Sequence, residues 1–175
     1  MDLRSVLEHY AGSSAATNRD TNNDFETVAR ELSPSALSPG VADAFRSDQT
    51  PPISEMVGHL FERSDPQQRA GVLNQILASI GPGLLSGVAG GALGNLLRHA
   101  GGLGTSGSAP SLSPEQAAKV TPEQAREITD HAERADPGIA DRLGQFYAEH
   151  PQLVKGLGGA ALAIVLGKLA NSRNT

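Results

Sequence analysis

The sequence predicts an all-α fold made of short helices, and three observations carry that prediction. From residue 24 onward the apolar residues recur at intervals of three and four, which is the spacing of one helix face. Hydroxyl–proline and aspartate–proline pairs precede these runs, and both residue types favour a helix N-terminus. No stretch alternates polar and apolar residues over enough β-branched positions to predict a strand.

The helix starts follow from those pairs. We expect helices to begin at the following positions: Ser38-Pro39, Thr50-Pro51, Asp65-Pro66, Ser113-Pro114, Thr121-Pro122, Asp136-Pro137 and Pro151. After both Ser113 and Thr121 a glutamine follows three residues later, which predicts reciprocal capping hydrogen bonds. The last of these helices is expected to run through the apolar segment that ends near residue 170.

The composition predicts a thin core. Large rings are rare, with 4 Phe, 2 Tyr and no Trp, while 20 Gly and 11 Pro raise the entropic cost of ordering the backbone. We therefore expect marginal stability that assembly would relieve. The N-terminus lacks the basic start and apolar run of a secretory signal, so we expect a cytoplasmic protein that is at most peripheral to a membrane.

Changes in composition divide the chain into four regions. We expect an N-terminal helix with a flexible tether over 1–23 and a helical domain over 24–100. A Gly/Ser linker over 101–112 then leads to a C-terminal helical hairpin or small bundle over 113–175. The first helix carries a short apolar stripe from Leu3 to Tyr10, which is expected to dock on the body or on a partner.

Two apolar segments carry glycine at helical spacing. No charged residue lies between Arg69 and Arg98, or between Lys155 and Lys168, and small residues in stripes let a second helix backbone approach closely. We predict self-association or membrane contact through these segments, at the following residues: Gly83, Gly87, Gly90, Gly91, Gly94, Leu84, Leu85, Val88, Leu93, Leu97, Gly156, Gly159, Leu162, Val165 and Leu166.

Patterns that suggest chemistry lack the context that the chemistry requires. Gly102, Gly104 and Gly107 match a dinucleotide-binding motif by letter, but they lie in the linker and follow no strand. Glu127 and His131 are four residues apart with no third metal ligand nearby, which is typical of a polar surface pair. We therefore predict no catalytic residue, no cofactor, no metal and no small-molecule substrate.

The net charge of −5 is evenly spread, without the basic stripe that counterion release on nucleic acid requires, so nucleic acid is not an expected partner. Three functions remain open. The first is a non-catalytic scaffold or structural protein that binds itself or another helical protein. The second is a membrane-associated protein that inserts or docks residues 76–97 and 152–170, although serine, asparagine and glycine dilute their hydrophobicity. The third is an enzyme whose site is assembled from residues distant in sequence.

Overall fold

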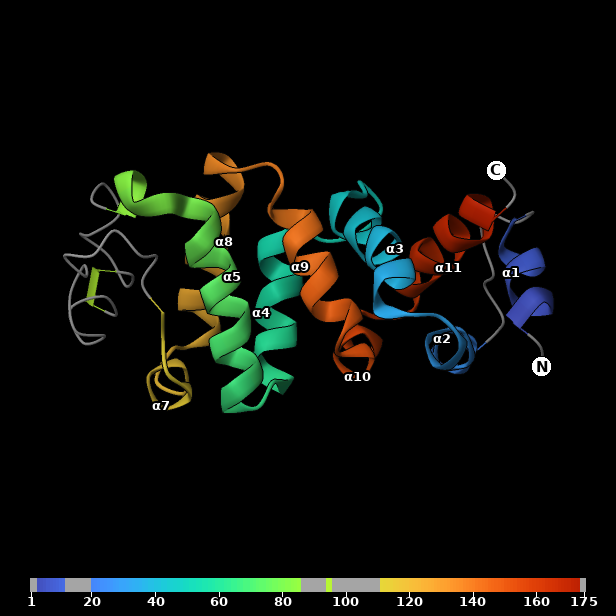
Figure 1. The fold of residues 1–175 in the computed structure, drawn as a ribbon, viewed down its shortest axis with the longest axis horizontal. Coiled ribbons are helices and arrows are strands. Elements are labelled where there is room, and N and C mark those ends of the chain that lie inside the picture. Colours follow the sequence, from blue (N-terminus) through green and yellow to red (C-terminus); the bar gives the residue numbers. More distant parts are fainter. Residues whose placement is uncertain (1–2, 12–19, 86–93, 96–110, 174–175) are drawn as a thin grey trace. The chain divides into compact units, whose positions relative to one another are not determined.

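The computed structural model describes residues 3–11, 20–85, 94–95 and 111–173 (Figure 1). Within these ranges every regular element is a helix and no strand occurs, which confirms the predicted all-α fold class. In chain order the elements are α1 (Leu3–Ala11), α2 (Thr21–Glu31), α3 (Pro34–Arg46), α4 (Ile53–Arg63), α5 (Pro66–Leu85), α7 (Pro114–Ala117), α8 (Pro122–Ala135), α9 (Ile139–Ala148), α10 (Pro151–Val154), the 3-10 helix η1 (Lys155–Leu157) and α11 (Gly159–Arg173).

The helices form two compact units. Unit 1 contains Met1–Pro52 and Ala140–Thr175, and unit 2 contains Ile53–Ile139. This division differs from the predicted regions 24–100 and 113–175, because each of those regions contributes helices to both units. The cause is packing: α7 and α8, which follow the Gly/Ser segment, lie against α5, and α8 also lies against α4.

In unit 1 the helix α11 is central, with α1, α2 and α3 packed against it. The apolar stripe of α1 is buried at Val6, Leu7 and Tyr10, so the structure docks this helix on the body of the chain. The hydroxyl of Tyr10 donates a buried hydrogen bond of 3.0 Å to Asp24 Oδ2 on α2. A buried carboxylate needs such a donor, and the bond therefore fixes α1 against α2.

The helix α9 contacts α3 within unit 1. A Cβ added to Gly144 would lie 2.9 Å from the backbone nitrogen of Ala42 and 3.0 Å from the carbonyl oxygen of Ser38. The absence of a side chain at Gly144 is therefore what allows the two helices to approach so closely. The rings of Phe45 and Tyr147 lie 5.7 Å apart between their centroids and fill the space beside this contact.

Unit 2 is held together by α8 on α4 and α5. The side chain of Arg126 on α8 lies over Gly58 on α4, where an added Cβ would be 2.2 Å from its Nε atom. The side chain of Asn74 on α5 bonds both backbone groups of Leu112, accepting from its N–H at 2.7 Å and donating to its carbonyl at 3.2 Å. This pair of bonds lets Leu112 bury its side chain although its backbone lies outside a helix.

Several predicted helix starts are confirmed. Ser113 and Thr121 each form a complete capping box, with Gln116 and Gln124 as the returning partners. Asp65 caps α5 in the same way, accepting from the backbone N–H of Gln68 at 2.8 Å. At these starts the capping side chain supplies the acceptor that the first turn of a helix lacks.

Other predicted starts are wrong. The proline of Ser38-Pro39 lies inside α3, which begins more than one turn earlier, at Ser33-Pro34. The buried Leu37 extends the apolar face of this helix towards the N-terminus. After Thr50-Pro51 and after Asp136-Pro137 the helices begin only at Ile53 and Ile139. In the second case the carboxylate of Asp136 accepts from the N–H of Gly138 at 2.8 Å and holds a turn before the helix.

The predicted single helix after Pro151 is broken. It consists of α10, η1 and α11, and the break lies at Gly158, whose φ of 89° is in the region that favours glycine. The chain turns there by 120° between its two helical parts. This turn separates Lys155, the first residue of η1, from the apolar helix α11 that follows.

Candidate functional site

The predicted contact residues fall into two groups, and the structure describes part of the first group and all of the second. Gly83, Leu84 and Leu85 lie in the last turn of α5, and Gly94 is buried in a described helical stretch with Asn95. The remaining residues of this first group lie outside the described ranges: Gly87, Val88, Gly90, Gly91, Leu93 and Leu97. The second group lies on η1 and α11 in unit 1.

One face of α11 is part of the core of unit 1. Leu162, Val165 and Leu166 are 0% exposed. The helix α3 covers this face, and a Cβ added to Gly40 of α3 would lie 3.0 Å from the carbonyl oxygen of Val165. These three predicted residues therefore contact other helices of the same chain. A partner could reach α11 only where α1, α2 and α3 leave it uncovered.

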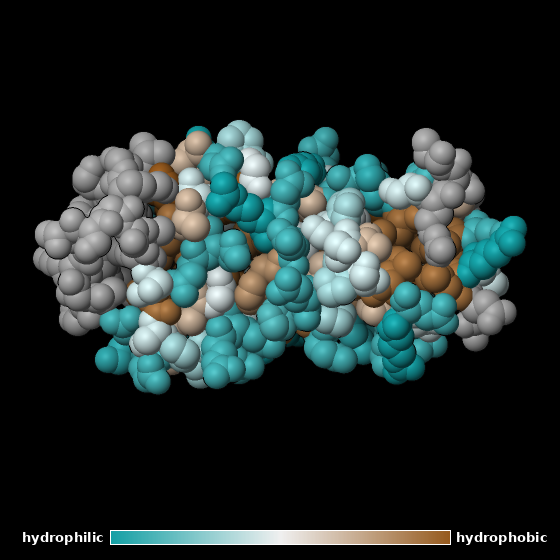
Figure 2. All heavy atoms as spheres, in the orientation of Figure 1, coloured by the Kyte–Doolittle hydropathy of each residue, from teal (hydrophilic) through white to brown (hydrophobic). Residues whose placement is uncertain are grey.

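The opposite face of α11 is apolar and remains partly exposed. On α11 it is exposed at Ala160 and half-buried at Ala163, Ile164 and Gly167, and half-buried Leu157 of η1 precedes it across the turn at Gly158. We call these five residues the outer face of α11. Figure 2 shows strongly apolar residues gathered on the surface over this helix, with hydrophilic residues around them. The predicted Gly156 and Gly159 adjoin the outer face, Gly156 half-buried and Gly159 exposed.

Charged residues border the outer face but do not enter it. Lys168 pairs with Asp43 of α3 across 2.8 Å, on the side of α11 towards α3. At the other end Lys155 donates to Glu26 Oε2 of α2 at 3.0 Å. Both lysines are thus held by carboxylates of unit 1, and the apolar residues between them are left without a charge.

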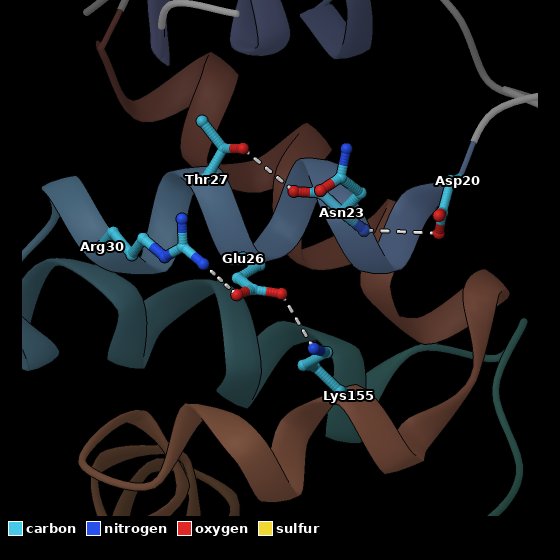
Figure 3. A network of polar contacts seen from close by, with 6 residues as sticks. All are labelled: Asp20, Asn23, Glu26, Thr27, Arg30 and Lys155. Atoms are coloured by element: carbon cyan, nitrogen blue, oxygen red, sulfur yellow. Dashed lines mark hydrogen bonds and ion pairs between the residues drawn. The ribbon is translucent and has the colours of Figure 1, made fainter.

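Glu26 is the centre of a polar network on α2 (Figure 3). Its carboxylate bonds to Lys155 and also to Arg30 one turn along the same helix. The hydrogen bond and charge of Lys155, and then those of Arg30, lower the pKa of Glu26 below its ordinary value. With Phe25, Ala29, Pro151 and Gln152, these three residues line a pocket of about 70 Å³.

This pocket is small for chemistry on a ligand. Sites for small molecules usually enclose about 300–1,000 Å³ of concave, mostly apolar space. A volume of about 70 Å³ holds a few water molecules, and the cations at its rim already share one carboxylate. Among the described residues no group of three or more His, Asp or Glu side chains is arranged to hold a metal ion.

None of the described helices is by itself both long and apolar enough to cross a bilayer. The bent pair Pro151–Leu157 and Gly159–Ser172 meets the length and hydropathy requirement only when its two parts are taken together.

No family model matches the chain, and no curated protein or solved structure matches it either.

Sequence reasoning missed the polar contacts that surround α11. Lys155 and Glu26 are 129 residues apart, and Arg46 and Asp141, which pair within unit 1, are 95 residues apart. Each of these residues reads as an ordinary surface charge in its own segment. The uncharged run from Gly156 to Gly167 indicates an apolar contact segment in the sequence. It does not predict which face of the helix is buried and which is exposed.

Proposed function

We propose that this protein has no catalytic role and acts by associating with itself through the outer face of α11. The observation that carries the proposal is that α11 is apolar on all sides from Gly159 to Gly167, while one of its faces there remains partly exposed. A helix that is apolar on every side is normally covered on every side, because water contact with apolar surface is unfavourable. The outer face therefore needs a partner.

The residue types on this face favour another helix as that partner. Ala160 and Ala163 project little from the helix, so a second helix backbone can approach closely there, and Ile164 supplies a larger apolar side chain beside them. Gly167 lies at the edge of this face, because a Cβ there would be 3.9 Å from the carbonyl oxygen of Tyr10 on α1. A charged partner would lose hydration without gaining an ion pair. A second copy of the chain offers the same apolar face, and a two-fold axis makes such a face complementary to itself.

Two further observations support a role in binding rather than catalysis. The described pocket of unit 1 is smaller than a substrate site, and its charged residues already pair with one another. The carboxyl groups whose pKa departs most clearly from the ordinary value have it lowered by ion pairs or helix caps, which keeps them ionised. A general acid near neutral pH needs the opposite shift.

A membrane surface is the alternative partner, and the bent pair around Gly158 favours it. Its hydropathy comes largely from Leu162, Val165 and Leu166, which are buried in unit 1. Contact with lipid through these side chains would require α3 to leave α11. The outer face alone offers small residues and one isoleucine, which bury little area in a bilayer.

The test is the mass in solution of three variants that add one carboxylate each. Ala160→Glu and Ile164→Glu place a charge on the outer face, while Ala78→Glu places it at an exposed alanine of α5 in unit 2. Light scattering over a range of concentrations should show the natural chain and Ala78→Glu as dimers or larger. Ala160→Glu and Ile164→Glu should be monomers with unchanged helix content by circular dichroism.

A natural chain that is monomeric at every concentration would overturn the proposal. Flotation with liposomes identifies the alternative: a natural chain that floats with lipid, together with an Ala160→Glu chain that does not, would assign the outer face to a membrane. Ala160 is suited to this test because it lies in the first turn of α11, where an added carboxylate is favourable for the helix itself.

A further inference from the structure

Two segments of the chain, 32–80 and 112–169, share a sequence pattern. Both open with Leu-Ser-Pro, at Leu32–Pro34 and Leu112–Pro114. Both then place a hydroxyl residue before a second proline, at Ser38-Pro39 and Thr121-Pro122. We call the two segments motif A (32–80) and motif B (112–169).

The middle helices of the motifs correspond residue by residue. α4 and α9 align without a gap when 86 is added to the number in α4. Five aligned pairs are then identical or similar apolar or small residues: Ile53 and Ile139, Val57 and Leu143, Gly58 and Gly144, Leu60 and Phe146, Phe61 and Tyr147. Four of these pairs are buried in both helices, the exception being half-buried Phe146 opposite buried Leu60.

The last helices correspond as well. The last helical region of each motif begins with Pro-Gln, at Pro66-Gln67 of α5 and at Pro151-Gln152 of α10. The buried positions of α5 and α11 then match, pair by pair: Val72 and Ala161, Leu73 and Leu162, Ile76 and Val165, Leu77 and Leu166, Ile80 and Leu169. Motif B differs in one respect, because the break at Gly158 divides its last helical region.

Each motif has a first long helix, α3 in motif A and α8, after the short α7, in motif B, and this first helix packs on the other motif. In unit 2, α8 of motif B lies on α4 and α5 of motif A. In unit 1, α3 of motif A lies on α11 of motif B and, at Gly144, on α9. The aligned glycines Gly58 and Gly144 mark the same place in the two units, each lying directly under the first helix of the other motif.

We infer that the chain is a tandem duplication of one helical motif whose first helices are exchanged, and we propose that two copies of the chain make the same exchange with each other. The α3 helix of a second copy would make the same contacts with α9 and α11 as the α3 helix of the same chain. Only the connections at 47–52 and 136–138 would change course, while every helix contact would be kept.

The exchange between chains competes with the exchange within one chain. The connection along the chain gives the internal partner a high effective concentration, so the internal form dominates in dilute solution. Unfolding and refolding at high protein concentration removes part of that advantage and should populate the exchanged dimer. This association uses the buried face of α11 and is therefore independent of the outer face.

Single cysteines can detect the exchanged dimer because the chain contains none. Asp43 on α3 and Lys168 on α11 form an ion pair of 2.8 Å and are both accessible at the surface. A chain with Asp43→Cys and an affinity-tagged chain with Lys168→Cys are refolded together at high concentration and treated with a short bis-maleimide. Each variant refolded alone measures the collisional background, and the double variant shows that the two positions can be linked within one chain.

We expect the mixed, once-tagged dimer at several times the background of either variant alone. The same two folded chains mixed without refolding should stay at the background level. A mixed dimer at background after refolding, with normal linking in the double variant, would overturn the exchange. Repeating the mixture with Ala160→Glu in both chains separates the two proposals, because that change removes the outer-face contact and leaves the exchanged contact intact.

Discussion

The helices α5 and α11 occupy equivalent places in the two units but differ on the side that faces away from the core. Asn74 and Gln75 of α5 correspond to Ala163 and Ile164 of α11. In unit 2 the chain itself covers part of this side, because Asn74 bonds the backbone of Leu112 just before α7. In unit 1 the helix α1 packs on α11, yet Ala163 and Ile164 stay partly exposed.

This difference bears directly on the proposed function. The core-facing residues of α5 and α11 are alike because both helices bury the same positions. The residues on their other faces differ with the surroundings of each helix. The helix α5 has polar residues where water or a backbone hydrogen bond meets it. α11 has small and apolar residues at the matching positions, which is what a surface for another helix requires.

The largest expected difference between the two units is the change in the free energy of unfolding when each aligned glycine is replaced by alanine. Gly144→Ala would place a Cβ 2.9–3.0 Å from backbone atoms of α3, which cannot move without displacing the helix. We expect a loss of about 1–3 kcal/mol in the free energy of unfolding. Gly58→Ala meets the side chain of Arg126 instead, at Nε (2.2 Å), Cγ (2.6 Å) and Cδ (2.9 Å), so the whole side chain must take another rotamer. A side chain can change rotamer where a backbone cannot move, and the gain in helix propensity offsets part of the cost, so we expect a smaller loss than in Gly144→Ala.

Urea unfolding of the two variants, followed by circular dichroism, measures both values. The comparison is informative because the closest approach in atomic distance is at Gly58, whereas the larger loss is expected at Gly144. Equal losses in the two variants would show that Arg126 is held as firmly as a backbone. The Nε atom of Arg126 is buried without a hydrogen-bond partner among the described residues, so releasing the side chain should also restore hydration.

The next effect concerns Tyr147, which corresponds to Phe61. Its hydroxyl is buried in unit 1 without a hydrogen-bond partner in the described part of the chain, and burial raises its pKa above the ordinary value. Removing an unsatisfied buried hydroxyl recovers its desolvation cost. Tyr147→Phe should therefore raise the free energy of unfolding by about 1 kcal/mol.

The reciprocal change, Phe61→Tyr, is the control in unit 2. It adds a hydroxyl to a ring that is 0% exposed, so the hydroxyl loses its hydration on folding. We expect a loss of stability there. A stabilising Phe61→Tyr, or a destabilising Tyr147→Phe, would mean that the aromatic positions of the two motifs are not equivalent.

The sequence predicts helix type well and helix grouping poorly. Periodicity and capping are local, so the capping boxes at Ser113 and Thr121 could be recognised from four residues each. The grouping depends on which apolar faces meet, and residues 101–112 look like a boundary by composition alone. The packing of α8 on α4 joins the segments before and after that boundary, and nothing local in either segment specifies it.

The candidate surface was half predictable for the same reason. An uncharged run from Gly156 to Gly167 can be read directly, whereas the turn at Gly158 and the buried side of Val165 depend on α3 and α2. The motif correspondence was also hidden in the sequence. The two motifs share few identical residues, and the segments between their helices differ in length. The aligned glycines Gly58 and Gly144 can be recognised as equivalent only from their contacts in the folded chain.

The two units also differ in how they lower the pKa of carboxyl groups. In unit 1 the pKa of Asp141 is lowered mainly by a hydrogen bond from Arg46, and that of Glu26 by Lys155, so both depend on residues distant in sequence. In unit 2 the pKa of Glu115 and of Glu123 is lowered by hydrogen bonds at their own helix starts. Acid should therefore weaken tertiary contacts in unit 1 and local caps in unit 2.

The smallest expected effect is the pH dependence that Glu26 contributes. Its folded pKa is below its unfolded one, so its contribution to stability is present above the unfolded pKa of about 4.3 and disappears as the pH falls through the folded pKa. Glu26→Gln should match the natural chain in strong acid and be slightly less stable at neutral pH. Lys155→Met should cause a similar loss, and the double variant should lose less than the sum because the two residues act as a pair. Urea midpoints of the four chains between about pH 3 and pH 7 provide the measurement, and fully additive losses would mean that Arg30 alone holds the carboxylate of Glu26.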